Sequence, residues 1–376
     1  MPSRYIRDPI FGDISINATV RPLLDNELMQ RLRYIKQLGF SYLVYPAANH
    51  SRFEHSLGTM KVTGDIASKI FFEEDHELSA AGLMHDIGHT PFSHQSEEIA
   101  TKYMHKTHEE IGADLIAHGS MRDAIADSTL SLKKVLGYLR GVGRGKLITG
   151  SLGSDRIDYL MRDAYHTGVA YGVIDYIRLM NKLTFSKHDG VAIYESGIAG
   201  AESMLIARYY MFSSVYLHHT AVISEAMYLL ALENAISEGD IVPRELVSFT
   251  DDKAILELLK SKASKGIMGM IMSRNLFKRA YYEEIGEKRI KIQEMSDAIE
   301  KLGVNHNDYI IKTISFKGGA DDAPLIDNAG AFTGMLSEKS ELFNTLSKIL
   351  NNRRILMVAC APKFKEKVST AIKKVL

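Results

Sequence analysis

The chain has 376 residues, of which 45% are hydrophobic and 24% charged, and its 46 basic and 46 acidic side chains give a formal net charge of zero. This balance excludes a broad positive field that would attract nucleic acid, so phosphate binding has to come from local clusters. A single cysteine excludes an intramolecular disulfide and a cysteine-rich metal site, and it favours a reducing compartment. The first residues hold no apolar stretch of the kind found in signal peptides, so we expect a cytoplasmic protein.

Most of the first 235 residues have apolar side chains at the spacing that is typical of helices. Residues 141–153 hold five glycines and predict a loop, and a short strand is predicted at 191–195. The loop does not match a phosphate-binding loop, because Leu147 stands where that motif has Ser or Thr. The predicted helices cover residues 27–38, 55–72, 78–88, 97–104, 109–118, 132–139, 155–165 and 200–236.

The character of the sequence changes after residue 238, and Val242-Pro243 marks a boundary. A chain of this length favours about two domains, which we place at residues 1–238 and 239–376. The second part predicts a helical extension and a small α/β subdomain, so the fold class is mostly α. Its predicted helices cover residues 252–262, 288–302, 338–351 and 363–374, and its predicted strands cover residues 309–316 and 354–359.

Histidines are concentrated in one part of the chain, because nine of the fourteen lie between residues 50 and 118. His55 is followed thirty residues later by the dipeptide His85-Asp86, and later by Asp155. Neutral imidazoles and carboxylates are ligands that suit a divalent transition metal. Four protein ligands leave positions open for water and for a phosphate oxygen, so this pattern favours a metal site that acts on phosphates.

A second pattern lies on the helix that is predicted at residues 155–165. Asp155, Tyr159 and Asp163 are spaced by four residues, so they share one helix face. A ligand carboxylate, a phenol and a second carboxylate would then form one wall of a site. The spacing is equally compatible with a solvated acidic stripe that is balanced by Arg156 and Arg162.

Six short segments together resemble a known family. They are Gln37-Leu38-Gly39, Tyr45-Pro46, residues 51–58, residues 85–94, Thr107-His108-Glu109 and residues 155–163. The resemblance is to the HD-domain phosphohydrolases, most of all to the branch of dNTP triphosphohydrolases and dGTPase-like enzymes. It covers roughly residues 4 to 235 and is weak beyond them, and it implies a helical HD-domain core around a divalent metal.

The resemblance implies ligands for the metal and groups that act on the phosphates. The implied metal ligands are His55, His85, Asp86 and Asp155, which suit iron, manganese, zinc, nickel or magnesium. His94 would contact the α-phosphate with His89 close by, and His108 would be an acid/base group oriented by Glu97. The family has the shorter aspartate at the position of Glu97, so Glu98 is a second candidate for that role.

The resemblance also implies residues that hold the rest of the substrate. The phosphates would be bound by Arg52, Arg156 and Arg208, and the deoxyribose by Gln37, Leu38, Tyr159 and Asp163. A tyrosine packed under C2′ would exclude ribonucleotides by its bulk. Without the resemblance, Tyr159 is interpreted as a core aromatic residue and Arg208 as a surface charge.

A second nucleotide site is implied by the same resemblance. The positions of Arg4, Tyr5, Asp25, Gln30 and Arg33 correspond to a guanine-nucleotide activator site that members of this branch form between subunits. These residues are equally compatible with a surface helix that carries ordinary charges. The basic residues that would bind a second activating nucleotide are replaced by Tyr194 and Ser196, so activation would be simpler or absent.

We therefore expect a metal-dependent dNTP triphosphohydrolase that releases deoxynucleoside and triphosphate, with a guanine nucleotide as a candidate activator. The alternatives are an HD-type hydrolase of GTP, a nucleoside monophosphate or a cyclic dinucleotide, and a nucleotide-binding regulator with an inactive site. The sugar-side residues Gln37, Tyr159 and Asp163 favour the first, and the complete set of ligands argues against the regulator. The resemblance implies a homo-oligomer, and we expect no membrane or nucleic-acid partner.

Overall fold

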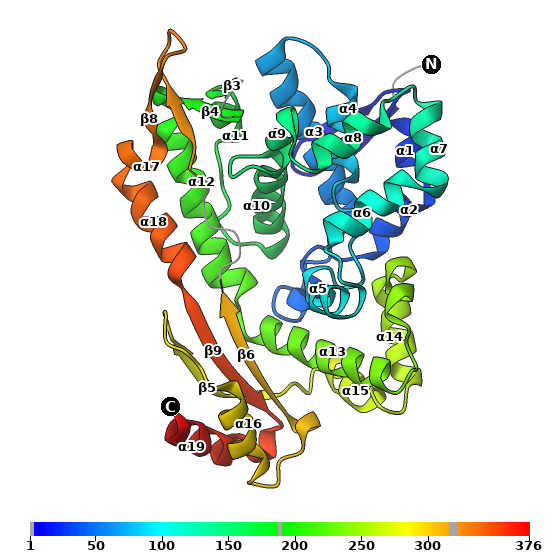
Figure 1. The fold of residues 1–376 in the computed structure, drawn as a ribbon, viewed down its shortest axis with the longest axis vertical. Helices are drawn as coiled ribbons and strands as arrows, with labels where there is room; N and C mark the ends of the chain where they lie inside the picture. The colour runs from blue at the N-terminus through cyan, green and yellow to red at the C-terminus, as the bar shows by residue number, and fades with distance from the viewer. Residues whose placement is uncertain (1–3, 187–189, 316–321) are drawn as a thin grey trace.

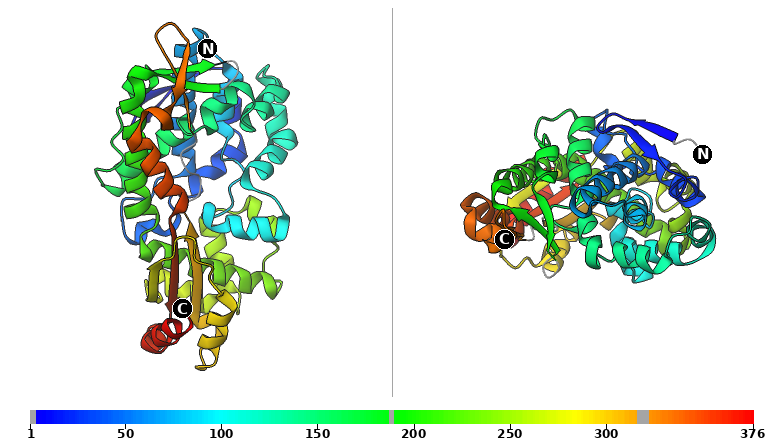
Figure 2. Two further views of the ribbon diagram at one scale, coloured as in Figure 1. Left: turned by 60° about the vertical axis from the view of Figure 1, so that its left-hand side comes forward. Right: turned by 90° about the horizontal axis from the view of Figure 1, so that it is seen from above.

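The computed structural model describes residues 4–186, 190–315 and 322–376, and for His94 and Gln95 it describes only the backbone. Most of these residues lie in helices, which form a broad upper body with a small sheet below it (Figure 1). Seen from the side, the lower part is narrower and contains the C-terminus (Figure 2). This arrangement confirms the prediction of a mostly α-helical fold with a small C-terminal α/β part.

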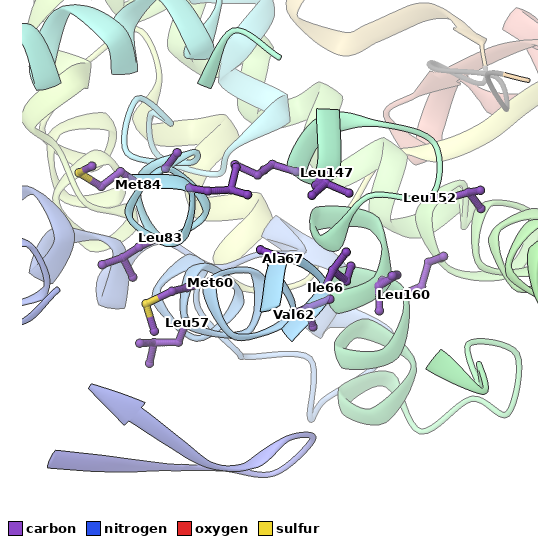
Figure 3. Packing of buried hydrophobic residues seen from close by; sticks show 14 of the residues in the cluster. Leu57, Met60, Val62, Ile66, Ala67, Leu83, Met84, Leu147, Leu152 and Leu160 are labelled. Carbon is purple, nitrogen blue, oxygen red and sulfur yellow. The ribbon is translucent and has the colours of Figure 1, made fainter. Parts of the chain in front are cut away.

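At the centre of the body one helix, α3 (Arg52–Phe71), packs against two others, α4 (His76–Met84) and α10 (Ser154–Thr167). The first of them begins in a capping box, because Ser51 accepts a hydrogen bond from the N–H of Glu54 and the Glu54 carboxylate accepts one from the N–H of Ser51. Apolar side chains from these helices form one buried cluster (Figure 3). This cluster fixes the ends of the helices that carry the site.

The other helices of the first part surround these three, and every helix that the spacing predicts is present in whole or in part. Residues 141–153, which were predicted to be a loop, include the short helix α9. The bounds are α1 (Arg21–Leu24), α2 (Glu27–Arg31), α5 (His94–Ile99), α6 (His108–Ala117), α7 (Gly119–Asp127), α8 (Leu132–Leu139), α9 (Lys146–Thr149), α11 (Tyr176–Met180), α12 (Ile198–Met211) and α13 (His219–Ser237).

Two helices that the spacing predicts as continuous are interrupted. The helix predicted at 27–38 ends early, and the backbone N–H of Lys36 donates to the Asp251 carboxylate instead of to a helical carbonyl. The helix predicted at 200–236 is divided into α12 and α13, because His218 between them is extended and caps the second helix with its ring. The prediction of a continuous helix was wrong in both places, since a backbone N–H donates to a side chain there and the helical pattern stops.

The strands form three sheets, with the orders β1-β2, β3-β4-β7-β8 and β5-β9-β6. Of these strands, the sequence predicted β4, β6 and β9, and the last residue of the strand predicted at 309–316 lies outside the described residues. The bounds are β1 (Arg4–Asp8), β2 (Gly12–Ile16), β3 (Leu183–Ser186), β4 (Gly190–Tyr194), β5 (Lys278–Glu284), β6 (Tyr309–Ser315), β7 (Pro324–Ile326), β8 (Phe332–Met335) and β9 (Arg354–Cys360).

The central strand of the lower sheet is β9, which pairs with β5 and β6 in antiparallel register. Its odd-numbered residues from Ile355 to Ala359 pack in the same cluster as residues of α13. Its even-numbered residues from Leu356 to Cys360 pack with those of α16 and α19 on the other face. A strand that is buried on both faces needs a continuous apolar run, which explains the sequence of this segment.

Several helices and strands of the second part pack against the first part of the chain. α18 packs on α12, and β7 pairs with β4, so contacts cross the division predicted at residues 238 and 239. That division stays a prediction. Among the described residues, no helix combines the length and the apolar character that a membrane span needs. The bounds are α14 (Asp251–Lys260), α15 (Lys265–Met272), α16 (Ile292–Glu300), α17 (Leu336–Lys339), α18 (Glu341–Asn352) and α19 (Lys365–Val375).

Candidate metal centre

The four residues predicted as metal ligands come from three helices and meet at one point. His55 lies in the first turn of α3, His85 and Asp86 follow the end of α4, and Asp155 lies in the first turn of α10. The Nε2 atom of His55 is 3.1 Å from Nε2 of His85, 3.0 Å from Oδ1 of Asp155 and 3.6 Å from Oδ2 of Asp86. The sequence prediction that these side chains converge is therefore matched by the geometry.

The outer nitrogens of both imidazoles are already engaged, which leaves the inner ones to face the cluster. Nδ1 of His55 lies 2.6 Å from a carboxylate oxygen of Asp158, and Nδ1 of His85 lies 2.9 Å from the carbonyl oxygen of Gly82. Metal-binding histidines in proteins usually use their second nitrogen in this way. The donor atoms of His55, His85 and Asp86 lie within 4.8 Å of one another, so this set fits a divalent metal ion.

Behind His55 lies a buried chain of ion pairs that the sequence analysis did not identify. Asp158 accepts from Arg162 at 2.8 Å, and Arg162 donates at 2.8 Å to Asp8 on the strand β1. The side chains of Asp158 and Arg162 are fully buried. The one sequence signal for this role was that Asp158 follows Asp155 by three residues, which places both on neighbouring positions of one helix face.

The electrostatics of the cluster favour a cation. Burial lowers the pKa of His55, but the hydrogen bonds with Asp155 and Asp158 outweigh it and raise that pKa to about 10. Burial alone would raise the pKa of Asp86, yet Arg52, His85 and His89 hold it well below its usual range. The carboxylates are therefore ionised, and the cluster attracts positive charge in the form of a proton or a metal ion.

A cavity of about 250 Å³ opens onto the cluster. It brings the metal-ligand candidates together with five other residues that the sequence analysis singled out, namely Gln37, Arg52, His89, His108 and Tyr159. Two buried polar atoms on its wall, Nη2 of Arg52 and Oε1 of Gln37, have no hydrogen-bond partner among the residues that the structure describes. One is a cationic donor and the other an acceptor, so both are suited to a bound ligand.

The two histidines beside the cluster are stacked on each other. The rings of His89 and His108 are 3.9 Å apart, and Nδ1 of His108 lies 2.7 Å from the carboxylate of Glu97. Glu98 instead forms an ion pair with Lys312 on β6 at 3.5 Å. Of the two glutamates that the sequence offered as partners for His108, the structure therefore brings Glu97 into contact.

Three further substrate candidates, Arg156, Asp163 and Arg208, are not among the residues that line the cavity. Both carboxylate oxygens of Asp163 are used, since Oδ1 lies 2.8 Å from Nε2 of His50 and Oδ2 accepts from the Tyr216 hydroxyl at 2.7 Å. Burial raises the pKa of Tyr159, while the charges of Arg208 and Arg156 act to lower it. The two arginines are thus close to Tyr159. His50 and Tyr216 were not predicted, because nothing in their local sequence points to Asp163.

The structure does not bring every candidate to the cavity. Leu38 packs partly buried against the apolar cluster. His94 begins α5, and its side chain lies outside the described part of the structure. The activator candidates lie on separate elements at or near the surface: Arg4 and Tyr5 on β1, Asp25 after α1, Gln30 on α2 and Arg33 beyond it. Among these, Gln30 accepts a hydrogen bond from Arg33 at 2.8 Å.

Comparison with known families and proteins identifies the fold. The family model described as "HD domain" matches residues 52–134, and that described as "HD associated region" matches residues 174–376. An uncharacterized protein of Methanocaldococcus jannaschii is 40% identical over 283 residues, which are 73% of this chain and 59% of that protein. The chain therefore spans less than two thirds of that relative. A deoxynucleoside triphosphate triphosphohydrolase homologue of Dictyostelium discoideum is 27% identical over 429 aligned positions, covering 100% of this chain and 80% of its own.

Solved structures agree with this assignment over nearly the whole chain. A hypothetical protein from Aquifex aeolicus is similar with a TM-score of 0.82 and 29% identity, covering 99% of this chain and 100% of the other. A phosphohydrolase from Bacteroides thetaiotaomicron is similar with a TM-score of 0.78 and 25% identity, covering 96% and 100%. The chain belongs to the HD-domain phosphohydrolases that carry an HD-associated region.

Proposed function

We propose that this protein hydrolyses deoxynucleoside triphosphates to deoxynucleoside and triphosphate. The observation that carries the proposal is that a single cavity joins the His/Asp cluster to Arg52, a phosphate-binding candidate, and to Gln37 and Tyr159, two sugar-binding candidates. The names of distant relatives from Dictyostelium discoideum and Bos taurus, both deoxynucleoside triphosphate triphosphohydrolases, support the same substrate class.

The proposed metal ligands are His55, His85, Asp86 and Asp155. When bound there, a divalent metal such as magnesium, manganese, iron, zinc or nickel supplies Lewis acidity toward water and phosphate oxygens. The protein's own part is to hold the ligands in place. Arg52 donates from Nη1 to Asp86 at 2.5 Å, which orients that carboxylate and leaves Nη2 for a phosphate oxygen.

The proposed proton transfer depends on His108. Glu97 accepts from Nδ1 of His108 and fixes the orientation of the ring, so that the other nitrogen is the one to give a proton to the departing 5′ oxygen. His89 is kept neutral, since burial together with the charges of Arg52 and His108 holds its pKa well below the usual value. We place His89 and His94 beside the α-phosphate as hydrogen-bonding groups.

The rest of the nucleotide is proposed to lie along α10 and the segment before α3. Oε1 of Gln37 would accept from the 3′ hydroxyl, and the ring of Tyr159 would leave no room for a 2′ hydroxyl. Leu38 and Asp163 would complete the sugar site, the latter through its hydrogen bonds with neighbouring side chains. Arg156 and Arg208 would bind phosphate oxygens, because guanidinium groups match their geometry.

Regulation and assembly form a further part of the proposal. A guanine nucleotide would bind at Arg4, Tyr5, Asp25, Gln30 and Arg33, and the protein would act as a homo-oligomer. The support for this is the resemblance of these positions to an activator site. The proposed activator site is tested by comparing the turnover of single nucleotides with that of nucleotide mixtures at a fixed protein concentration. An activator site requires that GTP or dGTP stimulate turnover of another dNTP.

Product analysis by chromatography tests the proposed reaction. The purified protein is incubated with each dNTP and with GTP in Mn²⁺ or Mg²⁺, beside His85→Gln and the control His76→Gln, a more exposed histidine at the start of α4. We expect deoxynucleoside and intact triphosphate from the wild type and the control, and none from His85→Gln. Orthophosphate or monophosphate as the sole product, or turnover of GTP alone, would reject the proposal.

A further inference from the structure

The HD-associated region contributes one buried carboxylate that contacts two segments of the first part of the chain, one just before the HD domain and one within it. Asp251, the first residue of α14, is 3% exposed. Its Oδ2 accepts from the backbone N–H of Lys36 at 2.8 Å, and its Oδ1 accepts from the backbone N–H of Phe92 at 2.7 Å. The two segments are far apart in sequence, so one side chain joins them to each other and to α14, which lies below α2 in Figure 1.

A partly buried arginine makes complementary bonds to carbonyl groups of the same region. Arg31, the last residue of α2, donates from Nη2 to the carbonyl oxygens of Ile87 and His89, at 2.9 and 2.8 Å, and from Nη1 to that of Phe249 at 3.0 Å. It therefore also connects the HD domain with the segment before α14. Arg31 and Asp251 have opposite charges. Burial lowers the pKa of Arg31, and the nearby Asp251 carboxylate acts to raise it.

The segments held in this way carry residues of the site. Lys36 directly precedes Gln37, and residues 87–93 include His89 and end at Ser93, whose hydroxyl accepts from Arg52. Phe92 and Ser93 both have positive φ angles, of 56° and 57°, which bulky residues rarely adopt. Such a backbone persists only when its surroundings hold it, and the Asp251 bond is made to the strained residue itself.

We propose that Arg31 and Asp251 are positioning residues, through which the HD-associated region fixes the loop 87–93 and the segment before Gln37 around the metal centre. This inference rests on the proposed function, because it assigns these two residues to the same reaction. Their loss would leave the metal ligands in place but would move His89, Arg52 and Gln37 relative to the substrate. The consequence is a lower kcat at unchanged metal content.

The test compares Asp251→Asn with the matched control Asp252→Asn, which makes the same charge change at the exposed neighbouring residue. In Asp251→Asn an amide nitrogen faces a backbone N–H, so one of the two bonds is lost. We expect kcat with dNTP to fall about tenfold to a hundredfold, with metal content unchanged. Hydrogen exchange should become faster in peptides that contain the N–H groups of Lys36 and Phe92. The control Asp252→Asn should match the wild type in kcat, in metal content and in hydrogen exchange.

A second variant keeps the test decisive if Asp251→Asn does not fold. Arg31→Lys retains the charge but has a single nitrogen in place of the two with which Arg31 reaches Phe249 and the loop 87–93, so it should show the same loss of kcat. The inference is overturned if the folded, metal-loaded variants keep the wild-type kcat, even where their thermal stability falls. If the wild type hydrolyses no nucleotide, the proposed function fails, and unchanged exchange at Lys36 and Phe92 would then separately overturn the structural part of the inference.

Discussion

At the scale of single residues, Asp158 illustrates a role that depends on a contact with a residue far away in the sequence, His55. It lies 2.6 Å from Nδ1 of His55 and is itself held by Arg162. We predict that Asp158→Asn lowers metal affinity about tenfold to a hundredfold, because the imidazole loses a charged partner that fixes its orientation. Isothermal titration calorimetry with the metal measures the affinity, and Asp123→Asn, at an exposed position on α7, is the control. Equal affinities of the two variants would show that the contact is not used for metal binding.

The pair Glu97 and Glu98 gives a second prediction at this scale. Glu97→Gln should lower kcat by at least about tenfold, since it weakens the group that orients His108, whose acid/base role is worth roughly a hundredfold or more. Glu98→Gln should leave kcat unchanged, because its side chain pairs with Lys312 instead. Steady-state rates on dGTP at saturating metal distinguish the two. If only Glu98→Gln lowers kcat, Glu98 and not Glu97 is the residue that orients His108.

At the scale of the helices, close packing of α3 and α10 requires a glycine. A Cβ atom at Gly58 would lie 1.7 Å from Oδ1 of Asp158 and 2.4 Å from Nη2 of Arg162. We predict that Gly58→Ala destabilises the protein by about 3 kcal/mol or more, since it overpacks against a buried ion pair. Gly137→Ala on α8 meets no atom within 4 Å and should stabilise by roughly 0.5–1 kcal/mol. Chemical denaturation measures both, and a neutral Gly58→Ala would contradict the packing account.

The sequence predicted the helices better than their ends, and it pointed to the candidate metal ligands, which the structure brings together, but not to the groups behind them. Helices with a strong apolar period, such as α3 and α10, were located within three residues at each end. The early end of α2 was missed because it depends on Asp251, 215 residues away from Lys36. β5 was missed because its side chains are mostly polar and half exposed. The ligands could be found because motif spacing carries them, whereas the contacts of Asp158 and Asp251 appear only in three dimensions.

At the scale of the whole molecule, the contact between the two regions should depend on pH. Burial raises the pKa of Asp251 from its ordinary value of 3.8 to about 6, although the N–H groups of Lys36 and Phe92 oppose this. The charged groups near it are Arg31, Lys36 and Asp252, and its charge also acts on the phenols of Tyr42 and Tyr228. Because the folded-state pKa is raised, the folded protein prefers the protonated carboxyl. The protonated Asp251 carboxyl therefore stabilises the folded protein. This stabilisation is complete below the pKa that Asp251 has in the unfolded chain, and it is lost as pH rises through about 6.

The corresponding prediction uses the difference in the free energy of unfolding between the wild type and Asp251→Asn. This difference should shift by about 3 kcal/mol against the wild type between about pH 4 and pH 7, which corresponds to about two pKa units. Urea denaturation across this range measures it. The difference in the free energy of unfolding between the wild type and Asp252→Asn should not change with pH. If the difference for Asp251→Asn does not change with pH either, the pKa of Asp251 is not raised in the folded protein.

The measurement that tests the central claim most directly is hydrolysis of a dNTP in water labelled with oxygen-18, followed by mass spectrometry of the products. The proposed attack at the α-phosphorus predicts one labelled oxygen in intact triphosphate and none in the deoxynucleoside, with His85→Gln forming neither product. Label in orthophosphate or in a nucleoside monophosphate would contradict the account. It would show either that water attacks another phosphorus atom or that pyrophosphate, not the deoxynucleoside, leaves the α-phosphorus, and it would assign this HD-domain centre to a different nucleotide reaction.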